Sequence, residues 1–168
     1  RPSTSPTLQR LVPANLRDPQ GKWYALTRRA RVPIVNPAIV DPASIKSYAD
    51  LADPALKGKL CLRNRKSPYN QSLVADQIIL RGEAATAKWI RGMANNVSQE
   101  FFPKDTPQVQ AVGKGKCGVA VVNTYYVGRM LAGRKGADNK ALAEKVKVVF
   151  PNPTHVNVSG AGVTASSD

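Results

Sequence analysis

The chain has 168 residues, of which 42% are hydrophobic and 21% are charged, enough apolar sequence to build one well-packed domain. No apolar run approaches the 18 or more residues that a membrane-spanning helix needs. The formal net charge of +14 raises nucleic acids and acidic partners as candidate ligands, but the basic residues are spread along the chain rather than collected on one helix.

The first third of the chain predicts a connecting arm, a strand and a short helix. Residues 1–22 are rich in Pro, Ser, Thr and Arg and show no clear period, so they are interpreted as the arm. Residues 23–35 alternate in part between apolar and polar, which indicates a strand, and Pro33 requires that this strand be at an edge or irregular. Residues 45–51 predict a short helix with Ser44 as its candidate cap.

From residue 59 onward, strand-like and helix-like segments alternate. Short apolar or β-prone runs predict strands at residues 59–63, 97–102, 118–122, 146–150 and 156–164. Helical spacing predicts helices at residues 68–80, 84–93, 106–113, 124–131 and 139–143. Ser67 and Pro68 mark one helix start, and Asp105 or Thr106 caps another. This order predicts an α/β fold with a mostly parallel or mixed sheet that is flanked by helices.

Few residues suit catalysis or the common metal sites. His155 is the only histidine, which excludes a site with several imidazole ligands, and no nucleophile-elbow motif is present for a Ser-His-Asp triad. Cys61 and Cys117 lack the paired close spacing of zinc sites. No acid–base pair or nucleophile system is visible, so we expect a binding protein rather than an enzyme.

Three tyrosines offer metal chemistry of another kind. Tyr69 falls in the first turn of the helix after strand 59–63, and Tyr125 and Tyr126 fall in the first turn of the helix after strand 118–122. Ligands of α/β sheets bind beyond the carboxyl ends of strands, so we expect the three phenols at one sheet edge. Phenolates are hard anionic ligands that suit Fe³⁺, and helix N-termini favour the ionised form. The alternative is ordinary aromatic packing.

Several segments resemble the ferric-iron-binding periplasmic proteins of bacterial ABC importers, most of all the branch without a synergistic anion, which includes the cyanobacterial iron-binding proteins. The segments that carry the resemblance are 67–73 (SPYNQSL), 123–126 (NTYY) and 155–164 (HVNVSGAGVT), with support from 12–17 and 29–32. Proteins of this family have two lobes joined by crossing strands, with iron clamped between the lobes. The resemblance therefore implies the substrate-binding component of an iron importer.

The resemblance also implies how the chain is organised. Residues 1–35 correspond to a connecting arm and an interlobe crossing strand, residues 36–155 to the α/β domain of the second lobe, and residues 156–168 to a return strand. The chain then looks like the middle of a longer protein that lacks its first lobe. The implied location is the periplasm, and the implied partners are ferric iron, the membrane permease of the importer and the missing first lobe.

The site residues follow from the same resemblance. Tyr69, Tyr125 and Tyr126 match the tyrosines that ligate iron, and Fe³⁺ is the expected ion, with Fe²⁺ left open. Arg29 and Arg129 are candidates for nearby cations that hold the phenolates ionised, and surface salt bridges are the alternative for each.

A disulfide between the two cysteines is also expected, because both lie in or next to predicted strands and the implied location is oxidising. The residues concerned are Cys61 and Cys117, and two small buried thiols are the alternative.

Two other functions remain open at this stage. A basic nucleic-acid-binding module would be retained on DNA in a salt-dependent way, although we expect no specific nucleic acid partner. A binding lobe for a small anion would use helix N-termini and stay colourless, whereas iron bound by phenolates colours the protein.

Overall fold

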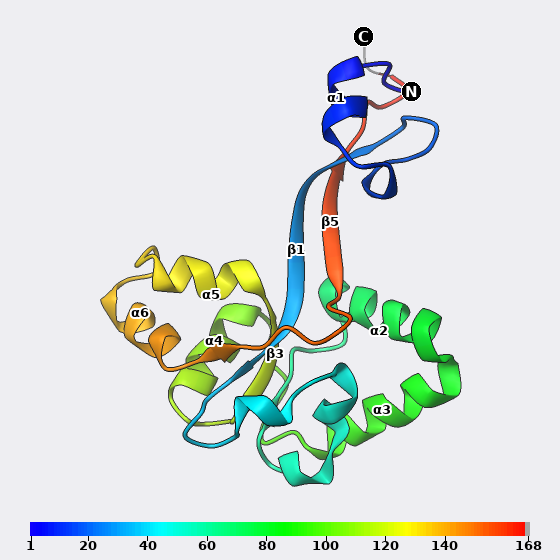
Figure 1. Cartoon of the computed structure of the whole chain (residues 1–168). Helices are drawn as coiled ribbons and strands as arrows, with labels where there is room; N and C mark the ends of the chain where they lie inside the picture. Colours follow the sequence, from blue (N-terminus) through cyan, green and yellow to red (C-terminus); the bar gives the residue numbers. More distant parts are fainter. Residues whose placement is uncertain (167–168) are drawn as a thin grey trace. The chain divides into compact units, whose positions relative to one another are not determined.

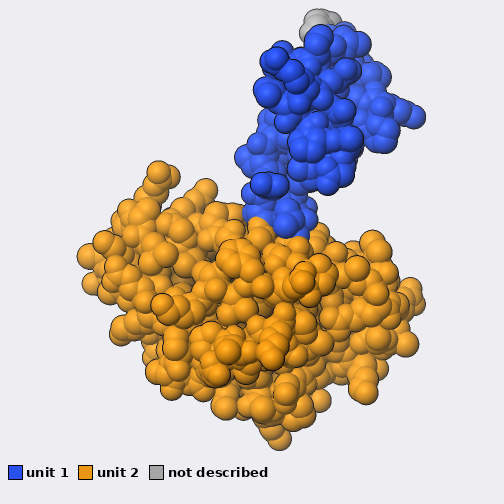
Figure 2. Space-filling model, viewed as in Figure 1, with its two compact units in different colours: residues 1–29, 156–168 blue, residues 30–155 orange. Residues whose placement is uncertain are grey.

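The computed structural model describes residues 1–166 and divides the chain into two compact units, which Figure 2 shows in different colours. Unit 1 comprises residues 1–29 together with the segment from residue 156 onward, and unit 2 comprises residues 30–155. The last two residues of the return segment, 167–168, lie outside the described part. No helix among the described residues has the length and apolar character needed to cross a membrane.

Unit 1 consists of short helical elements and parts of two paired strands. They are α1 (Pro6–Leu11), the 3₁₀ turn η1 (Ala14–Leu16), the first part of β1 (Tyr24–Val35) and β5 (Val156–Ala161), which pairs with β1. The Ser5 side chain accepts a hydrogen bond from the backbone N–H of Leu8 and so caps α1. Helix α1 has only six residues, too few for a helical period to show in the sequence.

Unit 2 is built on a mixed sheet. Its strands are β2 (Leu60–Cys61), β3 (Val119–Asn123), the second part of β1 and β4 (Lys147–Val148), in the order β2-β3-β1-β4. Strands β2 and β3 are parallel, whereas β1 runs antiparallel to both β3 and β4. This confirms the predicted α/β fold with a mixed sheet.

Helices cover both faces of this sheet (Figure 1). The helices of unit 2 are α2 (Pro68–Arg81), α3 (Glu83–Asn95), α4 (Asp105–Gly113), α5 (Thr124–Leu131) and α6 (Ala137–Glu144). Three 3₁₀ turns precede them, η2 (Pro42–Ser44), η3 (Tyr48–Ala52) and η4 (Pro54–Leu56).

Successive side chains of β3 point to opposite faces and enter two separate cores. Ala120 and Val122 pack with residues of α4, α5 and α6, whereas Val119 and Val121 pack with residues of α2, α3 and η3. A strand that is apolar on both faces is the expected centre of such a sheet.

Three local predictions are wrong. Residues 97–102 form no strand and make only two isolated bridges, Leu60 with Val97 and Arg63 with Phe102, because the chain bends between them. Ser44 caps nothing; Ser47 caps η3 instead, in a capping box with Asp50.

The third concerns the start of α4, where neither predicted residue serves as the cap. The N-cap position belongs to Lys104, and Asp105 is already the first helical residue. Its carboxylate instead forms ion pairs with Arg31 and Arg63.

Pro33 lies where β1 changes partner. The N–H of Arg31 bonds to the carbonyl of His155, and β4 pairs with β1 only at Ile34 and Val35. In a strand, the backbone N–H groups of residues two positions apart point to the same side of the strand. The N–H that Pro33 lacks would therefore point to the side that Arg31 uses, at the place where the partner of β1 changes from the segment at His155 to β4. The predicted irregularity is present, although β1 is an interior strand.

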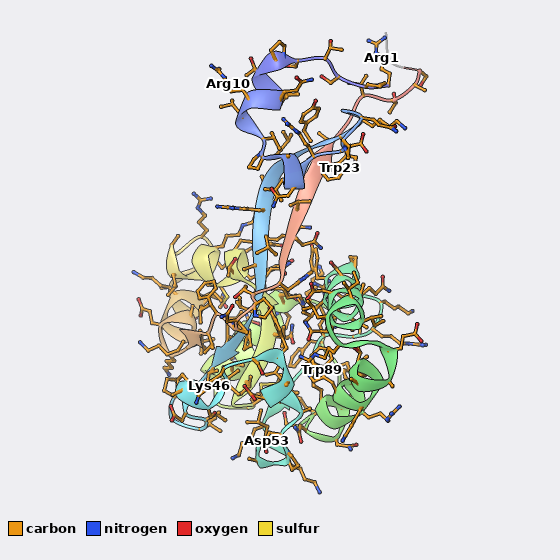
Figure 3. All side chains as sticks on the ribbon, turned by 45° about the vertical axis from the view of Figure 1, so that its right-hand side comes forward. Arg1, Arg10, Trp23, Lys46, Asp53 and Trp89 are labelled. Carbon is orange, nitrogen blue, oxygen red and sulfur yellow. A yellow bond between two sulfur atoms is a disulfide. The ribbon has the colours of Figure 1, made fainter. Side chains whose placement is uncertain are left out.

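Two contacts connect segments of unit 2 that are distant in the sequence. Cys61 of β2 and Cys117, just before β3, form a disulfide with a Cα–Cα distance of 5.9 Å. Trp89 points from α3 toward η3, where its indole N–H donates to the carbonyl of Tyr48 at 2.6 Å (Figure 3). Helix α3 is thereby fixed to the segment that follows β1.

Candidate metal centre

The three tyrosines lie at one edge of the sheet because of how α2 and α5 begin. Helix α5 starts at Thr124, directly after β3, and α2 starts at Pro68, seven residues after β2 ends. Pro68 at the first helical position suits a helix start. Since β2 and β3 are parallel neighbours, both helices begin beyond the same ends of their strands.

The hydroxyl groups of Tyr69 and Tyr125 lie 3.4 Å apart, with the Tyr125 hydroxyl donating to that of Tyr69. Two oxygens that share a small hard cation through bonds of about 2 Å lie roughly 3 Å from each other. The pair is therefore close to the spacing that joint ligation of one ion requires. These residues are 56 positions apart in the sequence, and the fold brings them together.

Tyr126 joins the pair through its ring. The rings of Tyr125 and Tyr126 are stacked, with centroids 4.4 Å apart and planes inclined by 30°. Tyr126 also packs against the apolar core formed with α4, α5 and α6, and it is partly buried. The three tyrosines consequently form one connected cluster, which we call the tyrosine cluster.

The two predicted cations have different surroundings. Arg129 lies one turn after Tyr125 on α5, and its guanidinium carbon is 5.0 Å from the centroid of the Tyr125 ring. Arg29 belongs to unit 1, where its guanidinium donates to the hydroxyl of Ser159 at 2.7 Å. The structure therefore brings Arg129 to the tyrosine cluster and pairs Arg29 with β5.

A buried ionic cluster adjoins Tyr69, and the sequence interpretation missed it. The carboxylate of Asp105 is fully buried, and its two oxygens each accept from a different arginine, Arg31 at 3.1 Å and Arg63 at 3.1 Å. The guanidinium carbons of these arginines lie 5.9 Å and 5.3 Å from the centroid of the Tyr69 ring. Two cations thus face the ring of one candidate ligand.

Arg31 is held by more than its ion pair. Its side chain is almost entirely buried and donates to the side-chain oxygen of Asn70 at 2.6 Å and to the carbonyl of Val121 at 3.1 Å. Burial lowers the pKa of Arg31 from its ordinary value, and the neighbouring Asp105 opposes that shift. Asn70 follows Tyr69 in α2, so the contact also fixes the first turn of that helix.

One sequence signal for this cluster exists in hindsight. Arg31 precedes the run Val32 to Val35, which is entirely buried, and a charged residue inside a buried strand needs a partner. Asp105 gave no such signal, because an acidic residue at a helix start is normally interpreted as a cap.

His155 joins α2 to β1, where its carbonyl accepts from the backbone N–H of Arg31 at 3.1 Å. Its Nε2 is 3.2 Å from the Ser72 hydroxyl, and its Nδ1 is 3.6 Å from the Asp76 carboxylate. Its backbone N–H donates to the Tyr48 hydroxyl, which itself donates to the carbonyl of Arg31. Burial lowers the pKa of His155 and raises that of Tyr48 to about 12. These contacts make His155 a structural histidine that is held by hydrogen bonds.

Other parts of the described chain do not offer a comparable metal site. Among residues 1–166, no group of three or more His, Cys, Asp or Glu side chains could hold a metal ion. A cavity of about 420 Å³ between α2 and α3 is lined mainly by apolar side chains such as Leu73, Trp89 and Met93. Such a lining cannot replace the hydration of a hard cation, so this cavity is not the metal site. The tyrosine cluster is the arrangement with suitable donor atoms.

Comparisons of the sequence with known proteins agree on one protein family. A family model described as "Bacterial extracellular solute-binding protein" matches residues 2–167. Iron uptake protein A1 of Synechocystis sp. is 42% identical over 171 residues, which cover 99% of this chain and 47% of that protein. The chain therefore spans about half the length of the curated relatives it matches.

Solved structures agree with this result. The Trichodesmium protein FutA (IdiA), solved in complex with iron and citrate ligands, superposes with a TM-score of 0.90 at 37% identity over 96% of this chain and 52% of that one. A Bordetella ferric binding protein superposes with a TM-score of 0.87 at 41% identity over 98% of this chain and 53% of that one. These relatives are binding and uptake proteins rather than enzymes.

Proposed function

The chain belongs to the family of bacterial extracellular solute-binding proteins, and on that premise we propose that it forms the ferric-iron-binding lobe of a substrate-binding protein for an ABC-type iron importer. The relatives named for iron uptake or ferric binding support iron as the solute. The observation that carries the proposal is the 3.4 Å separation of the Tyr69 and Tyr125 hydroxyls at the carboxyl edge of the sheet.

In this proposal Tyr69, Tyr125 and Tyr126 ligate Fe³⁺ as phenolates. Three phenolates supply three anionic oxygens, which match the triple charge of the ion, and each must lose its proton to bind. Arg129 lies against Tyr125 and would favour negative charge there. The preference of phenolate for hard cations favours Fe³⁺ over Fe²⁺.

The remaining parts of the proposal concern the protein as a whole. Proteins of this family are extracellular or periplasmic, so we place this chain in the periplasm. The disulfide between Cys61 and Cys117 suits an oxidising compartment. The partners would be the membrane permease of the importer and a first lobe that completes the iron coordination from residues outside this chain.

The test is a visible absorption titration of the purified chain with ferric citrate. Iron bound by phenolates produces a charge-transfer band, so the wild-type chain should turn red-orange on loading. Tyr69→Phe and Tyr125→Phe keep the rings and remove only the oxygens, and each should weaken both the band and the affinity. Tyr24→Phe, which alters a tyrosine of unit 1, is the matched control and should leave both unchanged. A colourless loaded chain would contradict the proposal.

A small-anion-binding lobe is the second candidate. It is favoured by the positive charges at the tyrosine cluster, Arg31, Arg63 and Arg129, of which Asp105 neutralises only one. Calorimetry with citrate alone distinguishes the two functions: anion binding without iron, in a chain that stays colourless when iron is added, favours the second candidate.

A further inference from the structure

Asp105 holds two arginines in fixed positions with a single carboxylate. Its Oδ2 accepts from Arg31 at 3.1 Å and from the backbone N–H of Asn123 at 3.0 Å, and its Oδ1 accepts from Arg63 at 3.1 Å. Two guanidinium charges against one carboxylate charge leave an excess of one positive charge in this buried cluster. That excess lies beside the ring of Tyr69.

Arg63 is fixed at two points along its guanidinium. The Nε donates to the carbonyl of Pro103 at 3.0 Å, and one terminal nitrogen donates to Asp105. The planar group is therefore held rigidly, with its carbon 5.3 Å from the centroid of the Tyr69 ring. Only 14% of the side chain is accessible to solvent, so water screens this cation poorly.

A rigid cation against an aromatic ring has two effects. It attracts the ring face and so restricts the ring's orientation, which places the Tyr69 hydroxyl near that of Tyr125. It also stabilises any negative charge that the ring and its oxygen carry, and this effect is larger where the dielectric constant is low.

We propose that Arg63 is a positioning residue of the tyrosine cluster: held by Asp105 and Pro103, it orients the Tyr69 ring and stabilises the negative charge of its oxygen in the metal-bound state. The inference rests on the proposed iron-binding function and deepens it. Arg31 contributes in the same direction, but it is also part of the core of unit 2, so Arg63 is the residue on which the role can be tested.

The test compares three variants of the ferric-loaded chain. Arg63→Gln removes the cation, and because the phenolate then loses stabilisation, the charge-transfer band should move to longer wavelength and ferric affinity should fall roughly tenfold. Arg63→Lys keeps the charge but loses the planar ring contact and should lie between. Arg65→Gln removes an exposed arginine two residues away and should match the wild type. A purely structural role would leave the band maximum unmoved.

A second measurement does not need iron. In the metal-free chain with labelled tyrosine rings, NMR resonances of Tyr69, identified with Tyr69→Phe, should shift in Arg63→Gln and stay in place in Arg65→Gln. A wild-type chain without a charge-transfer band would contradict the proposed iron-binding function. It would not decide the role of Arg63, because the ring resonances of the metal-free chain test that role separately. If Arg63→Gln fails to fold, Arg63→Lys decides the question. Unchanged ring resonances and an unchanged band in the folded Arg63 variant would overturn the inference.

Discussion

Asp105 is the residue on which the buried charges of unit 2 depend. Replacing it by Asn leaves Arg31 and Arg63 without a counter-charge in a buried setting, which typically costs about 3–5 kcal/mol. We therefore expect Asp105→Asn to lower the free energy of unfolding by roughly that amount, measured by urea denaturation.

The matched control is an exposed ion pair on α6. Lys140 and Glu144 are 3.9 Å apart one helical turn from each other, and both side chains are about half exposed. Glu144→Gln should change the unfolding free energy by no more than about 0.5 kcal/mol. Equal urea midpoints for Asp105→Asn and the wild type would show that the buried cluster contributes little.

His155 makes stability depend on pH in a specific direction. Burial lowers its pKa below the ordinary value of 6.5, and Asp76 opposes that shift. A group whose pKa is lowered in the folded state stabilises the fold fully above its unfolded pKa, and this stabilisation is lost as pH falls through the folded value. The groups that face it are Asp76, Ser72 and Tyr48, with Arg31 nearby.

We expect the unfolding free energy of the wild type to decline faster than that of His155→Gln as pH falls below 6.5. The comparison removes the pH effects that do not involve His155. Urea denaturation at half-unit steps from pH 7.5 to about 5 provides the measurement. Parallel curves for the two proteins would mean that His155 carries no such linkage.

At the residue scale, what the sequence could predict depended on proximity along the chain. Tyr69, Tyr125 and Tyr126 were placed at one sheet edge because each follows a strand at a helix start, a local pattern. The arginines could not be assigned that way, because Arg31 and Asp105 are 74 positions apart and Arg63 and Asp105 are 42 apart. Ion pairs over such separations are set by the fold and leave no period in the sequence.

Among the elements, β2 depends most on a covalent tie. It has two residues and pairs only with β3 as a named strand, and the disulfide joins Cys61 to Cys117 across 56 positions. Reducing it, or replacing both cysteines by Ala, should lower the free energy of unfolding by about 2–5 kcal/mol. Urea denaturation with and without a thiol reductant measures the loss.

The double alanine variant is its own control, because reductant should have no further effect on it. Counting thiols in the denatured, non-reduced chain gives an independent answer. Two free thiols per chain, or a wild-type urea midpoint that reductant leaves unmoved, would contradict a stabilising disulfide.

Helices and strands were predictable where their local signals were complete. Helix α2 has Pro68 at its start and Gly82 at its end, and β3 is a continuous apolar run, so both were located closely. Residues 97–102 have a strand-like composition, but Phe101 is 53% exposed and the chain bends instead of pairing. Whether a short apolar run becomes a strand is decided by tertiary neighbours, which the sequence alone does not show.

At the scale of the whole molecule, the chain contains a compact α/β unit, residues 30–155, and spans about half the length of its relatives. The tyrosine cluster lies entirely within that unit. Three phenolate oxygens leave coordination positions of Fe³⁺ to be filled by water, an added anion or residues outside this chain.

We therefore expect the isolated chain to bind ferric iron weakly and with strong pH dependence. Affinity should fall as pH is lowered, because the phenolates must release their protons to bind. Competition with a colourless chelator at several pH values measures this. Affinity that does not change between pH 8 and about 6 would indicate ligands that are already ionised, such as carboxylates, rather than phenolates.

Resonance Raman spectroscopy of the ferric-loaded chain tests most directly whether tyrosine oxygens of this unit bind the iron, as proposed. Excitation within the charge-transfer band should enhance tyrosine ring vibrations, which should move when the rings are deuterated. The enhancement should decrease with each replacement by Phe at Tyr69, Tyr125 and Tyr126, and it should persist in Tyr24→Phe. Iron-loaded protein whose spectrum shows no enhanced tyrosine vibrations would contradict the claim.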